Sequence, residues 1–228
     1  MSYTMFSAGA FRCLRAAHYH RLPLLAALVA TTFCPVDCLA QSLRSTFPGR
    51  RVGGGTRGEC SARLLAHLVP ANSIYAPGRT LQVGLLEGPT ANPKPIEIQF
   101  RRWSGAPSDQ MSEAMLATSE LPASTAGITL ISLEALNAPA VWESAYRCGD
   151  DESTSSDPLA FVQTASPPAL SLLVSDSEAD DLSIQKAIAN LRTQCGASVS
   201  TETFAKTFGL GDVIDTDWPV ELPVRCPS

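Results

Sequence analysis

The stretch IEIQFR, residues 96–101, alternates apolar and polar side chains without a break. Successive side chains of a β-strand point to opposite faces of its sheet. The pattern therefore places Ile96, Ile98 and Phe100 on a buried face and their neighbours in water. It predicts one strand of a sheet that covers a core on one side.

Similar β-rich runs surround this strand at short intervals. We expect strands at 63–69, 80–86, 96–103, 127–133 and 141–148, separated by turn-forming Pro, Gly and Asn residues, whereas 111–118 suits a strand or a short helix. Five or six strands at this spacing predict a mainly β fold, an antiparallel sandwich over residues 63–149. Tyr146 stands two residues before Cys148, the spacing of an immunoglobulin-type tyrosine corner, so the sandwich is predicted to be Ig-like.

The pattern changes in the last third of the chain. Residues 150–158 are acidic, Ser-rich and free of apolar side chains, which predicts a linker or exposed loop. Residues 159–228 predict a smaller α/β segment with one or two short helices. It has a strand at 169–174, a helix capped by Ser175 or Ser177 and ended by Gly196, and a second helix at 201–208. The first helix is expected to bury a face made of Leu182, Ile184, Ala187, Ile188 and Leu191.

Residues 1–40 have the order of a secretory signal peptide. Arg12, Arg15 and Arg21 come first, an apolar run follows at 22–33, and the small residues Cys38 and Ala40 suit the -3 and -1 positions of a cleavage site after Ala40. The run is shorter than the roughly 20 residues that span a membrane. We therefore expect a periplasmic or secreted protein with no transmembrane span after cleavage, beginning with a Gly/Arg-rich lead-in at 41–62.

Four cysteines remain after the signal peptide: Cys60, Cys148, Cys195 and Cys226. An even number in an exported chain predicts two disulfides, and single cysteines so far apart do not suit a zinc site. Three pairings are possible. Joining Cys60 to Cys148 and Cys195 to Cys226 keeps each bond within one predicted segment.

Charge argues against a general nucleic-acid-binding protein, which needs a basic surface. Residues 41–228 keep 14 of the 17 basic and 21 of the 22 acidic side chains, a net charge of -7. The basic side chains concentrate in residues 41–102. We favour internal charge complementarity there over the alternative, a basic patch of Arg50, Arg51 and Arg57 for a polyanion or membrane surface.

Several segments between residues 48 and 150 resemble a set of secreted cyanobacterial proteins of unknown function. These segments are Gly53 to Cys60 (GGGTRGEC), Leu68-Val69-Pro70, Ala126-Gly127-Ile128 and Trp142 to Cys148. Those proteins open with a Gly-rich Arg-Gly-x-Cys segment and continue as a predicted β-domain. The resemblance implies export and a β-fold. It implies no activity, because none is established for the family, and the helical region after residue 158 departs from its pattern.

Two short motifs do not have the context that their chemistry needs. Residues 53–58 satisfy Gly-x-Gly-x-x-Gly, but no buried strand precedes them and no helix follows. Ser183 and Lys186 form Ser-x-x-Lys without the partner motifs of penicillin-binding enzymes. Neither motif predicts an active site here.

Residues suited to catalysis or metal binding are few. His67, the only histidine after the signal peptide, lies in a predicted strand without a matching nucleophile motif, so we interpret it as structural. Asp212, Asp215 and Asp217 are a weak calcium candidate that lacks the EF-hand pattern, and a solvated acidic loop is the favoured interpretation.

The sequence therefore predicts an exported, non-enzymatic protein that binds a partner protein or an envelope component, or serves a structural role there. It predicts no cofactor and no catalytic residue. Two alternatives stay open: a small periplasmic hydrolase that uses loop carboxylates, and a secreted protease inhibitor with Pro-rich loops.

Overall fold

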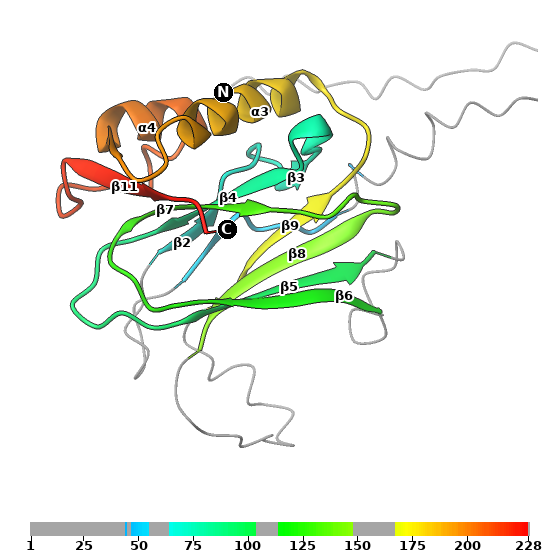
Figure 1. The fold of residues 1–228 in the computed structure, drawn as a ribbon, viewed down its shortest axis with the longest axis horizontal. Helices are drawn as coiled ribbons and strands as arrows, with labels where there is room; N and C mark the ends of the chain where they lie inside the picture. Colours follow the sequence, from blue (N-terminus) through cyan, green and yellow to red (C-terminus); the bar gives the residue numbers. More distant parts are fainter. Residues whose placement is uncertain (1–43, 45–46, 55–63, 104–113, 148–166, 228) are drawn as a thin grey trace, which may run out of the picture. The chain divides into compact units, whose positions relative to one another are not determined.

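Two β-sheets pack face to face, and two helices lie over one of them (Figure 1). The computed structural model describes residues 44, 47–54, 64–103, 114–147 and 167–227, all of them within the unit Val36–Ser228. The predicted signal peptide and the 150–158 linker lie outside these residues.

The first sheet has six strands in the order β1-β2-β4-β7-β11-β10. Its strands are β1 (Val52–Gly53), β2 (Leu65–His67), β4 (Gln82–Glu87), β7 (Gly127–Ser132), β11 (Glu221–Arg225) and β10 (Ser198–Ser200). The second sheet has five strands in the order β3-β9-β8-β5-β6. These are β3 (Ile74–Tyr75), β9 (Ala169–Leu173), β8 (Ala140–Tyr146), β5 (Ile96–Arg102) and β6 (Met115–Leu121).

The mainly β prediction is confirmed, but the fully antiparallel pairing is wrong. β11 runs parallel to β7, and β3 runs parallel to β9. Parallel neighbours need long crossover connections, and both pairs join strands far apart in the sequence. Periodicity within a single strand carries no information on such distant pairing. The immunoglobulin-like form of the sandwich stays a prediction.

β4 shows why the fold has three layers. All six of its residues are buried, because the second sheet covers one face and the helices cover the other. Gly84 suits this crowding: a Cβ atom at this position would lie 2.6 Å from the side chain of Leu68. A strand covered on both faces has no room for alternating polar residues.

Helix α3 (Ala179–Arg192) lies in the predicted place and buries four residues of the predicted face, Ile184, Ala187, Ile188 and Leu191, but not Leu182. Leu182 is 58% exposed, whereas Asp181 is fully buried among Ile184, Ile188 and Leu191. The carboxylate of Asp181 accepts hydrogen bonds from the backbone N–H groups of Ala76 and Glu178. It also forms an ion pair with Arg44 at 2.8 Å. Glu178 is the N-cap, in place of the expected serines. The buried carboxylate therefore joins the start of the helix to the backbone of Ala76 and to Arg44.

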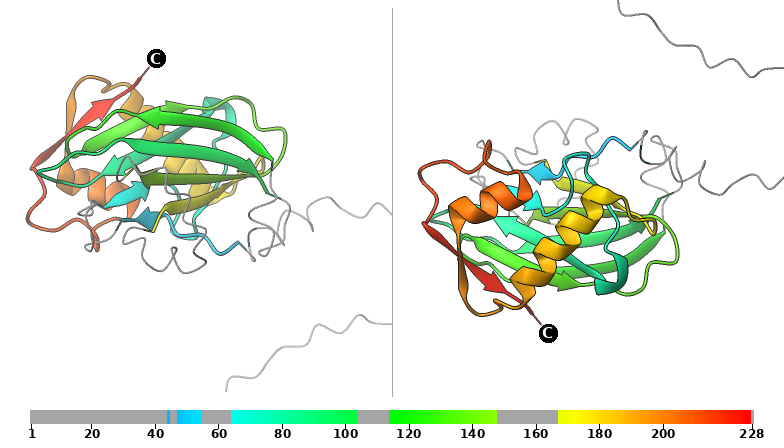
Figure 2. Two further views of the ribbon diagram at one scale, coloured as in Figure 1. Left: turned by 90° about the horizontal axis from the view of Figure 1, so that it is seen from below. Right: turned by 90° about the horizontal axis from the view of Figure 1, so that it is seen from above.

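The second predicted helix, at residues 201–208, is confirmed as α4 (Thr201–Phe208). The side chain of Ser200 accepts the N–H of Thr203 at the start, and Gly209 ends the helix with a φ of 59°. Seen from above in Figure 2, α3 and α4 lie side by side over the sheet. Phe204 and Phe208 of α4 pack into the same core as α3.

Residues after 158 take part in both sheets, since β9 lies between β3 and β8 and β11 lies between β7 and β10. The predicted bond between Cys195 and Cys226 is present, with Cα atoms 5.7 Å apart. It ties the turn after α3 to the end of β11. Cys60 and Cys148 lie outside the described residues.

Replacing both Cys195 and Cys226 by serine is expected to lower the free energy of unfolding by about 3–4 kcal/mol. The bond closes a loop of 31 residues, and its loss returns that loop's entropy to the unfolded chain. Denaturant unfolding of the oxidised protein measures the difference, with the reduced wild type as a control. A loss below about 1 kcal/mol would contradict this account of the bond.

Candidate functional site

β6 is the outermost strand of the second sheet, and among the described residues it pairs only with β5. Six of its seven residues are exposed, including Met115 at 51% and Leu116 at 46%. Its outer edge is therefore a row of backbone N–H and C=O groups without strand partners in the described chain. Soluble proteins usually protect such an edge with Pro, Lys or a bulge. β6 contains no Pro and no Lys, and its one protective feature is a β-bulge near its start, where the pairing passes from Phe100–Ala117 to Arg101–Met115 and leaves Leu116 as the extra residue.

One face of β6 is uncovered although it continues the face that forms the core. Ala117 lies opposite Phe100 and Ser119 lies opposite Ile98, and both β5 side chains are buried. Ala117 and Ser119 are nevertheless exposed. Their side chains are too small to reach the facing strand β7, so the space between the two sheets stays open along β6.

Two hollows of about 580 and 620 Å³ occupy this space. Both are lined by Ser119 of β6 and by Ile131 and Ser132 of β7, so they form one groove. We call it the β6 groove. The first hollow adds Leu116, Ala117 and Leu136, and the second adds Leu121, Leu130 and the disulfide. Volumes of this size are typical of binding sites.

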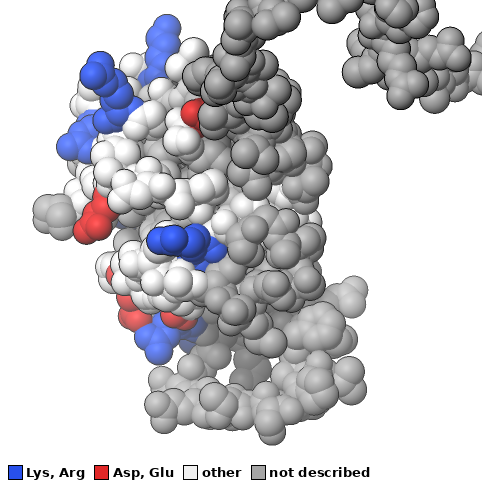
Figure 3. Space-filling view, turned by 90° about the vertical axis from the view of Figure 1, so that its right-hand side faces the viewer, with Lys and Arg blue, Asp and Glu red and all other residues white. Residues whose placement is uncertain are grey.

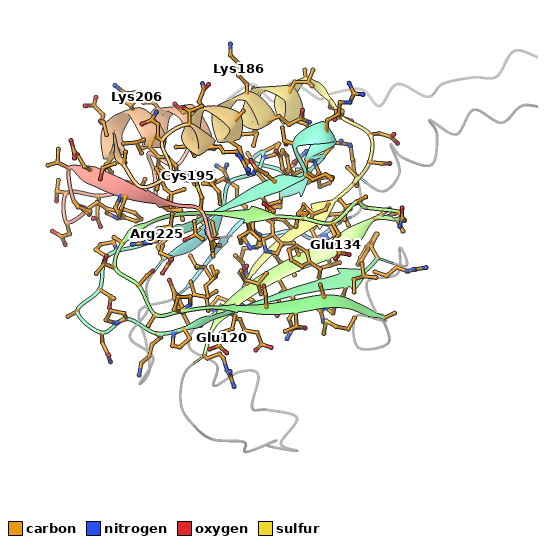
Figure 4. The ribbon with its side chains drawn as sticks, viewed as in Figure 1. Glu120, Glu134, Lys186, Cys195, Lys206 and Arg225 are labelled. Atoms are coloured by element: carbon orange, nitrogen blue, oxygen red, sulfur yellow. A yellow bond between two sulfur atoms is a disulfide. The ribbon has the colours of Figure 1, made fainter. Side chains whose placement is uncertain are left out.

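Charged side chains lie at the borders of the β6 groove. Arg102 and Glu134 line the first hollow, and Glu120 and Arg192 line the second. Glu120 also forms an ion pair with Arg147. Figure 4 labels Glu120 and Glu134. Each hollow therefore combines an apolar wall with both signs of charge at its border.

His67 occupies a different environment, wholly inside the core. Its Nδ1 lies 2.8 Å from the hydroxyl of Ser171 and its Nε2 lies 3.0 Å from that of Ser144. Its ring stacks on Trp142 with the ring centroids 3.5 Å apart. All four side chains are fully buried. No solvent or substrate reaches this Ser–His arrangement, which agrees with the structural interpretation.

Arg51 does not belong to an available basic patch. Its guanidinium donates to the carbonyls of Val69, Phe208 and Gly209, so it caps the C-terminal end of α4. A cation there also complements the helix dipole. Burial lowers the pKa of Arg51, and the charge of Asp212 opposes that effect. The neighbouring Arg50 is exposed, and Arg57 lies outside the described residues.

Figure 3 shows one face of the described residues. On the part of that face that is not grey, blue and red side chains form small groups separated by white, uncharged ones. The charge of Arg51 is partnered inside the fold by three backbone carbonyls and by the nearby carboxylate of Asp212, whereas internal charge complementarity for residues 41–102 as a whole stays a prediction.

The three calcium candidates do not gather round a common point. Asp215 accepts the backbone N–H of Asp217 at 3.1 Å, and Asp212 interacts electrostatically with Arg51. All three are exposed. In the described part of the chain no group of three or more His, Cys, Asp or Glu residues is arranged to hold a metal ion. The structure thus gives the calcium prediction no support.

The sequence did not identify the β6 groove, because nothing in residues 111–121 marks the strand as an edge. Its side chains are small or apolar and carry no chemistry of their own. The one available signal is the poor alternation of Met115 to Ser119, which left that segment ambiguous. A strand exposed on both faces has no reason to alternate.

Comparison with known proteins adds no assignment: no family model, no curated protein and no solved structure matches this chain. The resemblance to secreted cyanobacterial proteins therefore stays a prediction. Among the helices that the structure describes, none is both long enough and apolar enough to cross a membrane.

Burial keeps the pKa of His67 well below its usual value of 6.5, which predicts a specific loss of stability in mild acid. Below pH 6.5 the unfolded chain binds a proton at this residue that the folded chain does not. The free energy of unfolding then falls as the pH falls, by up to about 1.4 kcal/mol per pH unit from this group.

The measurement is the free energy of unfolding between pH 5 and 8 for the wild type and for His67→Gln. Carboxylates contribute equally to both proteins, so the difference between the two isolates His67. We expect that difference to shrink steadily below pH 6.5. A difference that does not change with pH would show that the folded protein binds the proton as readily as the unfolded one.

Proposed function

We propose that this chain is an exported, non-enzymatic binding protein that holds an extended segment of a partner protein or envelope component along β6. One observation carries the proposal: a seven-residue edge strand, unpaired on its outer side among the described residues, beside an open apolar groove. Export rests on the signal-peptide pattern of residues 1–40.

The backbone of β6 determines the shape of the partner segment. A row of N–H and C=O groups is matched by another extended chain, which adds a strand to the sheet. Alternate side chains of that added strand then point toward the groove and away from it. The groove between Ala117, Ser119 and Ile131 suits small or medium apolar side chains.

The charged borders of the groove favour a segment that is polar at its ends. Glu120 and Arg192 line one hollow, and Arg102 and Glu134 line the other. Such rim charges set orientation and association rate more than affinity. The partner segment is therefore expected to have an apolar centre flanked by charges of either sign.

The two alternatives have less support. A hydrolase built on carboxylates needs two of them about 5–10 Å apart across a cleft, whereas Glu120 and Glu134 line different hollows and Glu120 is paired with Arg147. An inhibitor needs an extended rigid loop. The Pro-rich loop between β4 and β5 contains a local turn at Thr90, whose hydroxyl accepts the N–H of Asn92, rather than an extended segment throughout.

A pair of lysine substitutions on neighbouring residues tests the proposal. Ala117 points into the groove, while Thr118 lies opposite Gln99 on the other face of the sheet and does not line the groove. Both residues are exposed, so neither change is expected to alter stability by more than about 0.5 kcal/mol. Ala117→Lys is expected to weaken the binding of an added strand by at least about tenfold, because a charge then fills the groove.

The probe is a displayed library of random twelve-residue peptides, selected on the exported, oxidised wild-type protein. The enriched peptides are measured by fluorescence anisotropy against Ala117→Lys and against the matched control Thr118→Lys. We expect loss with the first variant and retention with the second. Failure to enrich any peptide, or equal binding to both variants, would overturn the proposal.

A further inference from the structure

A second groove lies between α3, α4 and β10, and shares no residue with the β6 groove. Its volume is about 350 Å³, within the range of small-molecule sites. We call it the α3–α4 groove. Its rim consists of six uncharged polar side chains: Asn190, Gln194, Ser198, Ser200, Thr203 and Thr207. Leu191 and Phe204 contribute to its apolar floor.

No charged side chain lines the α3–α4 groove, although both helices carry charges. Lys186 of α3 and Lys206 of α4 point away from the sheet in Figure 4. Lys206 forms an ion pair with Glu202, also outside the groove. A ligand that carries a phosphate or carboxylate therefore finds no countercharge in this groove.

Three of the rim side chains are free to bind a ligand. Asn190 lies in the last turn of α3 and Gln194 lies in the turn that follows the helix, and both are exposed. The backbone carbonyl of Asn190 accepts a hydrogen bond from the hydroxyl of Thr193. The side chains of Asn190, Gln194 and Ser198 make no hydrogen bond within the described chain. By contrast, the hydroxyl of Ser200 accepts the N–H of Thr203, and the hydroxyl of Thr207 donates to the carbonyl of Thr203.

The groove is held in shape by its surroundings. Phe204 and Phe208 pack together with their ring centroids 4.9 Å apart. Cys195, which follows Gln194 directly, is bonded to Cys226 at the end of β11. A rim fixed before binding loses less conformational entropy when a ligand arrives.

From this chemistry we propose that the α3–α4 groove binds a neutral saccharide. Amide and hydroxyl side chains both donate and accept hydrogen bonds, as sugar hydroxyls do. The apolar floor suits the C–H faces of a sugar ring, and the lack of charge disfavours anionic ligands. This site is additional to β6 and does not depend on the function proposed for that strand.

The test is titration of the oxidised, isotope-labelled protein with glucose, N-acetylglucosamine and their short oligomers, followed by NMR chemical shifts. Glucose 6-phosphate and glucuronic acid serve as charged counterparts. We expect shifts concentrated at Asn190, Gln194 and Ser198, with the neutral sugars binding more tightly than the charged ones. The double variant Asn190→Ala/Gln194→Ala is expected to weaken binding by about tenfold, since two hydrogen-bonding groups are lost.

Lys186→Ala is the matched control, because Lys186 is exposed on α3 one turn before Asn190 and does not line the groove. It should bind neutral sugars as the wild type does. Three results would overturn the inference: no shift with any neutral sugar, tighter binding of the charged sugars, or equal weakening by the control. Shifts in these residues on adding a β6-binding peptide, and none with sugars, would assign the groove to a protein partner instead.

Discussion

The imidazole of His67 joins the two sheets by directed hydrogen bonds, and the alignment of the core depends on it. β2 of the first sheet supplies the ring, while β8 and β9 of the second supply Ser144 and Ser171. The hydrophobic effect has no preferred direction, whereas the two hydrogen bonds at 2.8 and 3.0 Å are directional and set a defined alignment of the sheets. The neutral ring is required, because a buried charge without a counterion is strongly unfavourable.

The hydrogen bonds of His67 lie away from β6, the strand along which the two sheets are open. Within the second sheet β8 and β9 lie toward one side, and β6 is the strand at the far edge. The sheets are bonded together at β8 and β9, while the small side chains of Ala117 and Ser119 leave a gap at β6. The C-terminal residues reinforce the first sheet, where the Cys195–Cys226 bond holds the end of β11 beside β7. Rigid packing on one side thus leaves an edge available on the other.

Local patterns predicted the elements well, because strand alternation and helix caps are local in sequence. Residues 96–102 and 201–208 form the predicted strand and helix, and Cys195 bonds to Cys226 as one of the possible pairings had it. The failures involve distant partners. Asp181 replaces Leu182 in the core because Arg44 and the N–H of Ala76 reach it. Arg51 caps α4 from more than 150 residues away. The β6 groove depends on which strand lies at the edge, and no local pattern carries that information.

Amide hydrogen exchange along β6, read residue by residue in the oxidised protein, tests the central claim most directly. In an antiparallel pair every second residue directs its N–H toward the partner, and the others point away. A free edge therefore predicts alternation from Ala117 to Leu121, where the register with β5 is regular, with protected amides facing β5 and fast exchange at those between them, while β5 and β8 are protected throughout. Uniform protection of Met115 to Leu121 at all protein concentrations would show that another segment already covers this edge, and would contradict its role as a binding site.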